Sequence, residues 1–161
     1  MAGLACRPRG TRLIVAVVQR VIPAPPDQVF AVLANGWSYS DWVVGTVHIR
    51  DVDEHWPQSG ARLHHTAGPW PLSLSDTSTV ISCQPGDELT LRAGLWPLGE
   101  ATIVFRLAPT PGNGTRVTIA ESFTGGPLHW IRTKLDDLVL HHRNRETLRR
   151  LSDIATRQTV G

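Results

Sequence analysis

Apolar and polar residues follow two different periods along the first part of the chain. Leu13–Ile22 is mostly β-branched and apolar, which predicts a strand. In Pro25–Leu33 two prolines and an aspartate precede apolar residues at helical spacing, and this predicts a helix that Asn35-Gly36 would end. Trp37–Trp42 then carries three aromatic residues in six positions, which indicates a short second helix or a turn.

From Thr46 onward the apolar residues recur at every second position, which is the period of a half-buried strand. Prolines and glycines divide these alternating runs into segments with short turns between them. This regular spacing predicts an antiparallel meander rather than strands joined by crossover helices. The six predicted strands are Thr46–Val52, Ala61–Thr66, Ser73–Cys83, Glu88–Ala93, Glu100–Leu107 and Thr115–Phe123.

The chain closes with a long amphipathic helix, predicted from about Pro127 to Ala155. Such a helix would be roughly 45 Å long, enough to cross a whole domain. A curved antiparallel sheet of about seven strands around this helix leaves room for a cavity between the two. We therefore expect one α+β domain over residues 12–157, preceded by a flexible extension over residues 1–11. The apolar stripe of the helix consists of Leu128, Ile131, Leu135, Leu138 and Val139, followed by Leu148, Leu151 and Ile154.

Composition and charge narrow the classes of function. Of the 161 residues 41% are hydrophobic and 19% charged, with a formal net charge of +2, as in an ordinary globular domain. The densest basic cluster, Arg143–Arg150, includes Glu146 and has no interleaved aromatics, so we interpret it as a solvated helix face. No apolar run approaches the ~20 residues of a membrane span, and Leu13–Val18 is too short for a signal peptide. We expect a cytoplasmic protein with no integral membrane segment and no nucleic-acid partner.

Cysteines and histidines give no metal-binding pattern. The two cysteines lack the spacing of a metal site or of a disulfide framework. The pairs His64-His65 and His141-His142 are direct neighbours in the sequence. Neighbours in a strand point to opposite faces, and neighbours in a helix diverge by about 100°, so neither pair can chelate an ion. We expect no metal and no cofactor.

Three segments carry a resemblance to a known family. They are Val21–Leu33, the aromatic segment Trp37–Trp42, and Arg143–Leu151 in the predicted last helix. Over residues 13–157 the chain resembles the START-like (SRPBCC) superfamily, in particular its polyketide cyclase/dehydrase and lipid-transport branch. The resemblance implies the helix-grip fold and the binding of a hydrophobic or amphipathic small molecule between sheet and helix. Some members of the family are cyclases, dehydratases or hydrolases, and a homodimer is compatible with it.

Strand parity selects the side chains that would face the cavity, because alternate residues of a strand share one face. In the last strand Glu121 shares its face with Ile119, so it would point inward. A buried carboxylate is costly unless it is paired or protonated, which makes Glu121 a candidate functional group. Alternatively, near its strand end, it reaches solvent or pairs with an arginine. Leu63 and His65 would also face inward, and His65 would be either an acid–base group or a satisfied structural residue.

Aromatic and helical residues complete the predicted pocket. Six tryptophans are many for this length, and an indole offers a large apolar face with one N–H donor. The group Trp37–Trp42 is predicted to line the pocket mouth, although for any single tryptophan core packing is the better explanation. His142 continues the helical stripe and would face either the cavity or solvent. The predicted ligand-binding residues are Trp37, Tyr39, Trp42, Leu63, His65, Trp70, Leu91, Trp96, Phe105, Glu121, Phe123, Ile131, Leu135, Leu138 and His142.

Three functions follow from these features. We predict first a carrier or sequestering protein for a hydrophobic or amphipathic small molecule, lipid or polyketide-like, because few polar groups are expected inside the cavity. The alternative is a cyclase/dehydratase-like enzyme in which Glu121 or His65 abstracts a proton while Tyr39 or a tryptophan N–H stabilises the oxyanion. The third is a protein-interaction module that uses the long helix or an exposed sheet edge.

Overall fold

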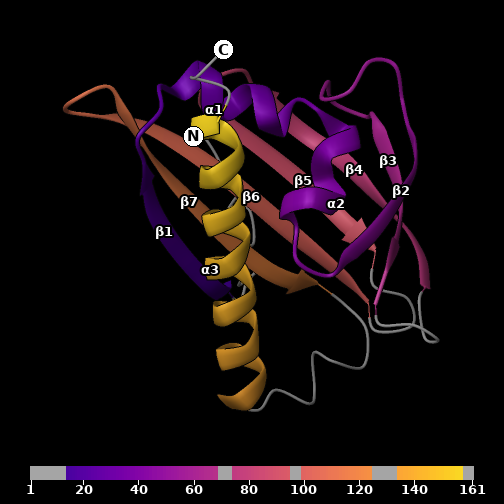
Figure 1. Cartoon of the computed structure of the whole chain (residues 1–161). Helices are drawn as coiled ribbons and strands as arrows, with labels where there is room; N and C mark the ends of the chain where they lie inside the picture. Colours follow the sequence, from indigo (N-terminus) through magenta and orange to yellow (C-terminus); the bar gives the residue numbers. More distant parts are fainter. Residues whose placement is uncertain (1–13, 69–73, 95–98, 125–133, 158–161) are drawn as a thin grey trace, which may run out of the picture.

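The fold is a single antiparallel sheet with all its helices on one face (Figure 1). A computed structural model describes residues 14–68, 74–94, 99–124 and 134–157. The seven strands are arranged in the order β1-β7-β6-β5-β4-β3-β2, which confirms the predicted α+β helix-grip architecture. The strands are β1 (Ile14–Ile22), β2 (Thr46–Val52), β3 (Arg62–Ala67), β4 (Leu74–Gln84), β5 (Glu88–Gly94), β6 (Glu100–Thr110) and β7 (Gly114–Thr124).

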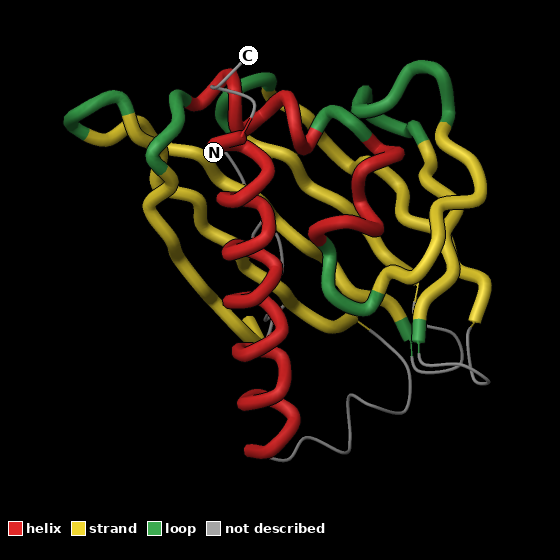
Figure 2. Tube along the Cα trace, in the orientation of Figure 1, coloured by secondary structure: helices red, strands yellow, loops and turns green. Residues whose placement is uncertain are grey.

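Strand order follows from the short connections that the turn residues predict. From β2 to β7 each strand pairs with the next one along the chain, and β1 pairs with β7 at the far edge. Figure 2 shows that the strands form a curved surface behind the helices. Registers such as Phe105 opposite Ile119 put apolar residues of neighbouring strands on the helix side. The alternation seen in the sequence therefore becomes one buried face of the sheet.

Three short helical segments cover one end of this face: α1 (Pro26–Leu33), η1 (Gly36–Ser38) and α2 (Tyr39–Trp42). Pro26 begins α1 where a missing N–H costs nothing, and the four large apolar residues of the helix, from Val29 to Leu33, are buried. Gly36 lies against β2, since an added Cβ would stand 2.7 Å from a methyl group of Val52. The close approach needs a residue without a side chain, and it fixes how the turn meets the sheet.

The last helix, α3 (Lys134–Arg157), crosses in front of the sheet. Its predicted start at Pro127 lies outside the described residues, and its end falls two residues beyond the predicted Ala155. Leu148 and Leu151 are buried against β1 and α1 as the stripe predicts. Leu138 and Val139 are 53% and 59% exposed, so their predicted place in the buried stripe is wrong. The beginning of α3 projects beyond the described strands in Figure 1, so these strands do not cover it.

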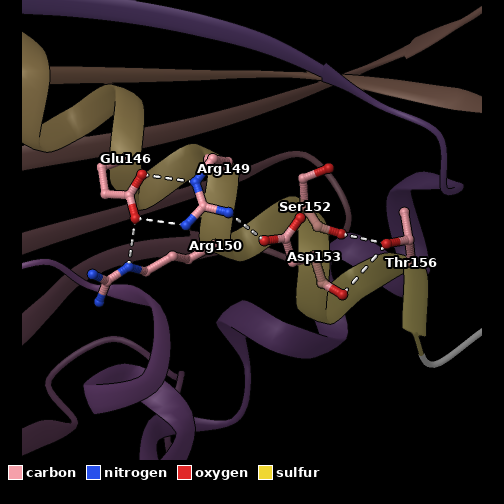
Figure 3. Close-up of polar contacts among 6 residues, drawn as sticks. All are labelled: Glu146, Arg149, Arg150, Ser152, Asp153 and Thr156. Atoms are coloured by element: carbon pink, nitrogen blue, oxygen red, sulfur yellow. Dashed lines mark hydrogen bonds and ion pairs between the residues drawn. The ribbon is translucent and has the colours of Figure 1, made fainter.

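The outer face of α3 carries the basic cluster seen in the sequence except Arg143, and Arg149 and Arg150 are paired within the helix (Figure 3). The carboxylate of Glu146 accepts hydrogen bonds from Arg149 and Arg150 at 2.8–2.9 Å. Arg149 also donates to Asp153 at 2.8 Å. These contacts between residues three and four positions apart support the interpretation of this cluster as a solvated helix face. None of the described helices is long and apolar enough to span a membrane.

Candidate ligand-binding site

A cavity of about 250 Å³ lies between the concave side of the sheet and the middle of α3. Strands β3 to β7 supply its floor, and α3 covers it from Arg143 onward. The segment 43–46 between α2 and β2 supplies one rim. The cavity thus lies where the sequence analysis expected one. Its lining residues are Tyr39, Val43, Val44, Gly45, Thr46, Leu63, His65, Ala67, Gly68, Ser78, Leu91, Ala93, Gly94, Ala101, Ile103, Phe105, Ile119, Glu121, Arg143, Asn144 and Thr147.

Most of the cavity wall is apolar. Side chains of leucine, isoleucine, alanine and phenylalanine from β3, β5, β6 and β7 project into it because alternate positions of each strand face α3. Phe105 is 3% exposed and is backed by Trp42, whose ring centroid lies 5.8 Å away in an edge-on arrangement. A wall of this kind favours an apolar ligand body, since burial of apolar surface stabilises the bound state.

One side of the cavity holds a polar cluster made by β7 and α3. Glu121 on β7 is only 2% exposed, and its Oε2 accepts a hydrogen bond from the guanidinium of Arg143. The same oxygen accepts a second bond from the Asn144 amide nitrogen at 3.0 Å. Two donors, one of them a cation, compensate the buried carboxylate. Glu121 thus lines the cavity and also pairs with an arginine; its functional role stays a prediction.

His65 on β3 lines the cavity from the opposite end of the sheet. The residue is 8% exposed, and its Nδ1 is buried without a hydrogen-bond partner. Burial lowers the pKa of His65; the Asp76 carboxylate and the Leu63 backbone act in the opposite direction, and the positive charges of Arg50 and His64 add to the lowering. The imidazole is therefore neutral at neutral pH, with one nitrogen as donor and the other as acceptor.

Asp76 lies beside His65 at the edge of the same cavity. The two residues are direct partners in the β3–β4 register. The Asp76 carboxylate packs on Gly94, since a Cβ at that position would stand 2.3 Å from its Oδ1. Burial raises the pKa of Asp76, while its hydrogen bond from the Thr77 backbone N–H, 2.7 Å long, works in the other direction. This end of the cavity thus holds a carboxylate beside His65, and Arg50, whose guanidinium donates to the Asp76 carbonyl at 3.5 Å, is a cation close by.

The aromatic group after η1 contributes one wall residue and has its polar atoms committed elsewhere. Tyr39 lines the cavity, but its hydroxyl donates to the Leu33 carbonyl at 2.9 Å, and burial raises its pKa. The Trp42 N–H donates to the Ser38 hydroxyl at 3.3 Å, and the Trp56 N–H donates to Leu33 at 3.3 Å. Each of these three donors already has an acceptor outside the cavity, either the Leu33 carbonyl or the Ser38 hydroxyl, so none of them is free to stabilise an oxyanion as predicted.

Two hydrogen bonds hold the rim of the cavity. The backbone N–H of Val44 donates to the Thr147 hydroxyl of α3 at 3.2 Å. The Gly68 N–H donates to the Gly45 carbonyl, also at 3.2 Å, and ties the end of β3 to the α2–β2 segment. Gly45 has a φ of 100°, a left-handed conformation in which other residues are strained. The rim is therefore fixed at both ends, to the helix and to the sheet.

The structure places the predicted site residues in four groups. Those on the cavity wall are Tyr39, Leu63, His65, Leu91, Phe105 and Glu121. Those away from the wall are Trp37, Trp42, Phe123, Leu138 and His142. Trp70, Trp96 and Ile131 lie outside the described residues. The backbone of Leu135 belongs to α3, but its side chain is not among the described ones. Contact with a ligand stays a prediction for every member of the first group.

The residues away from the wall have definite reasons for their positions. Trp37 is 58% exposed because the three-residue helix η1 turns it outward, whereas Trp42 is fully buried in the core behind Phe105. Phe123 is half-buried near the end of β7. His142 is exposed on the outer side of α3, beside Arg145. Of the two predicted directions, cavity or solvent, it therefore faces solvent.

Sequence reasoning predicted helix residues in the pocket but did not identify the α3 residues that line it, Arg143, Asn144 and Thr147. Arg143 was assigned to the solvated face, and Asn144 and Thr147 were not considered. The signal was present, because Asn144, Thr147, Leu148 and Leu151 recur at spacings of three and four, and all are buried. Polar residues on the buried stripe of a helix indicate a cavity or a polar partner opposite. In the described ranges no three His, Cys, Asp or Glu side chains are grouped to hold a metal ion.

Comparison with known families adds an independent observation. The family described as "Polyketide cyclase / dehydrase and lipid transport" matches residues 14–155, most of the chain. The chain belongs to this family. The match covers all seven strands and nearly all of α3, so it includes every described residue of the cavity wall. The resemblance inferred from the sequence is thereby confirmed.

Solved structures with the same fold have little sequence in common with this family member. Protein NE0264 from Nitrosomonas europaea has a TM-score of 0.70 at 18% identity, over 91% of this chain and 96% of that one. The Zhui aromatase/cyclase from Streptomyces sp. R1128 has a TM-score of 0.68 at 16% identity, over 89% and 94%. Ara h 8.0201 has a TM-score of 0.69 at 10% identity, over 88% and 96%. At these identities the likeness concerns the fold. A search of curated proteins found no significant match.

Proposed function

We propose that the protein binds a hydrophobic or amphipathic small molecule, lipid or polyketide-like, as a carrier or sequestering protein. One observation carries the proposal: a cavity of about 250 Å³ with a mostly apolar wall lies between sheet and helix. Apolar pockets with a few placed polar groups are the usual form of small-molecule sites. The family's description names lipid transport and polyketide chemistry, which agrees with such a ligand.

The polar groups of the cavity favour binding over chemistry. Glu121 already accepts two hydrogen bonds on one oxygen, from Arg143 and Asn144, which holds it in a structural role. The hydroxyl of Tyr39 is committed to the backbone of Leu33. An enzyme needs a base and a group that stabilises developing charge, both free to reach the substrate. The cavity also argues against a pure interaction module, which needs no such space between sheet and helix.

The test is native mass spectrometry of the purified protein, followed by organic extraction of what co-purifies. We expect a small apolar molecule bound one to one. Ala101 on β6 is 1% exposed and lines the cavity, so Ala101→Leu should fill the space and reduce binding. Ala108 is exposed on the same strand, and Ala108→Leu is the matched control that should retain the ligand. A protein that is empty and binds no member of a broad hydrophobic library would overturn the proposal.

A second function, a cyclase/dehydratase-like enzyme, is favoured by one observation. His65 is neutral, lies on the cavity wall and has an Nδ1 without a partner, as a general base requires. In that case His65→Gln should abolish turnover of a polyketide-like substrate while binding persists. Retained turnover in His65→Gln would exclude this role for His65.

A further inference from the structure

The charges around the cavity decide which polar group a ligand can carry. Among the described residues that line it, Arg143 is the one permanent cation, and it is paired with Glu121. At the other end the Asp76 carboxylate packs on Gly94, a lining residue. On the described cavity wall an anionic ligand would therefore meet one cation that is already paired with a carboxylate; the Asp76 carboxylate and Arg50 lie behind the wall at the other end. Burying a charge without a partner is costly, so the cavity disfavours a carboxylate ligand.

A neutral group finds a partner in His65. This side chain is more than nine-tenths buried, it lies on the cavity wall, and its Nδ1 makes no hydrogen bond. A buried polar atom without a partner costs free energy that a matching ligand group recovers. A hydroxyl both donates and accepts, so it can pair with either tautomer of the imidazole, whereas a ketone can pair only with an N–H.

The cavity opens to solvent on one side, and its volume indicates how much of a ligand it can hold inside. An apolar cavity of about 150 Å³ is known to hold one benzene molecule. By proportion, the 250 Å³ found here holds roughly ten non-hydrogen atoms. That is the size of two fused six-membered rings, and it is far below a long-chain lipid. Phe105 and Leu91 present the flat and branched apolar surfaces between which such rings could lie.

We propose that the ligand bound in this cavity is a compact, neutral one- or two-ring compound whose hydroxyl group pairs with the imidazole of His65. The inference rests on the proposed function and names the ligand class of the same site. It separates this protein from a carrier of fatty acids, whose carboxylate and long chain the charges and the volume both disfavour. His65 serves here as a specificity-determining residue.

The experiment compares three naphthalenes that differ in one substituent, 2-naphthol, 2-methylnaphthalene and 2-naphthoate, with oleate as a fourth probe. Binding is measured by calorimetry and by NMR titration of the intact chain at neutral pH. We expect 2-naphthol to bind about tenfold more tightly than the methyl analogue, because only it pairs with His65, and naphthoate to bind still more weakly. Oleate should bind weakly or not at all.

Two variants assign the preference to His65. His65→Phe keeps an aromatic ring of similar size but no hydrogen-bonding nitrogen, so naphthol and methylnaphthalene should bind equally well. His64→Phe is the matched control: His64 is the neighbouring histidine, and its Nδ1 lies 3.0 Å from the Thr77 hydroxyl. It should retain the tenfold preference. If His65→Phe does not fold, NMR of the wild-type protein takes its place. The ¹⁵N chemical shifts of the His65 ring should then change on addition of naphthol and not of methylnaphthalene.

Each result has a distinct meaning. Equal affinity for all three naphthalenes, or tighter binding of naphthoate, overturns the neutral-hydroxyl inference and leaves the carrier function standing. Binding of oleate alone overturns the compact ring ligand and indicates a lipid carrier. Binding of none of the four overturns the inference and, together with an empty protein in native mass spectrometry, the proposed function as well. If His65→Phe still prefers naphthol, a group other than His65 forms the hydrogen bond with the ligand hydroxyl, and the inference is overturned.

Discussion

The contact between β7 and α3 offers the sharpest test of how this fold is held together. Glu121 is 2% exposed, whereas the Arg143 side chain is 31% exposed. Replacing Arg143 by methionine keeps most of the apolar stem and removes the charge. The buried carboxylate is then left with Asn144 as its partner, at 3.0 Å. Replacing Glu121 by glutamine leaves Arg143 without its carboxylate partner instead, but this long side chain can extend its charge into solvent.

The magnitudes follow from this asymmetry. A hydrogen bond to a charged group contributes about 1.5–3 kcal/mol, and breaking a fully buried ion pair costs about 3–5 kcal/mol. Because Asn144 keeps one bond and Arg143 is partly exposed, we expect Arg143→Met to lower the free energy of unfolding by about 2 kcal/mol. Glu121→Gln should cost about 1 kcal/mol, since glutamine can still accept from Asn144. The double variant should be more stable than Arg143→Met alone, because no buried charge remains.

The assay is urea unfolding followed by tryptophan fluorescence, with all four proteins of the cycle at one pH and one salt concentration. Arg145→Met is the control, because Arg145 is exposed on the same helix, and it should change stability by less than about 0.5 kcal/mol. The reasoning is refuted if Arg143→Met is no less stable than Arg145→Met. It is also refuted if the double variant is the least stable of the four.

Three further predictions concern titratable groups. Burial lowers the pKa of His65, so the protein should lose stability as the pH falls below about 6.5. In urea unfolding at several pH values, the free energy of unfolding of His65→Phe should depend less on pH than that of the wild type, and an equal dependence would contradict this. Burial raises the pKa of Asp76, so Asp76→Asn should stabilise the protein at neutral pH and lose this advantage once the carboxyl of the wild type is protonated in acid. Hydrogen bonds from Arg149 and then Arg150 lower the pKa of Glu146 to about 2, and its NMR titration should return toward 4.5 in Arg149→Gln; an ordinary midpoint in the wild type would show that the pairs do not persist in solution.

The directions of strand side chains could be predicted because they depend on local geometry. Parity placed Leu63, His65 and Glu121 on the inner face, and all three line the cavity. The same kind of argument failed for Leu138, which keeps the helical spacing of the buried stripe but is 53% exposed. Spacing tells which side of a helix is apolar, and it does not tell how far the helix extends beyond its partner.

The aromatic segment shows the same limit over a few residues. Trp37 and Trp42 are five positions apart, and both were predicted to line the pocket mouth. The turn from η1 into α2 directs Trp37 to solvent and Trp42 into the core against Phe105, so neither lines the cavity. Composition identifies an aromatic cluster, but rotation about a short helix decides which ring meets which surface.

The sequence by itself determined the order of strands and helices, the apolar face of the sheet and the family, because periodicity and turn residues act within a few positions of the chain. The tertiary structure alone decided that Arg143 and Asn144 reach Glu121, twenty-two and twenty-three positions away, and that His65 has no partner for its Nδ1. Such contacts depend on the distance and angle at which a helix packs on a sheet. That geometry is set by the sum of all core contacts, which no local pattern contains.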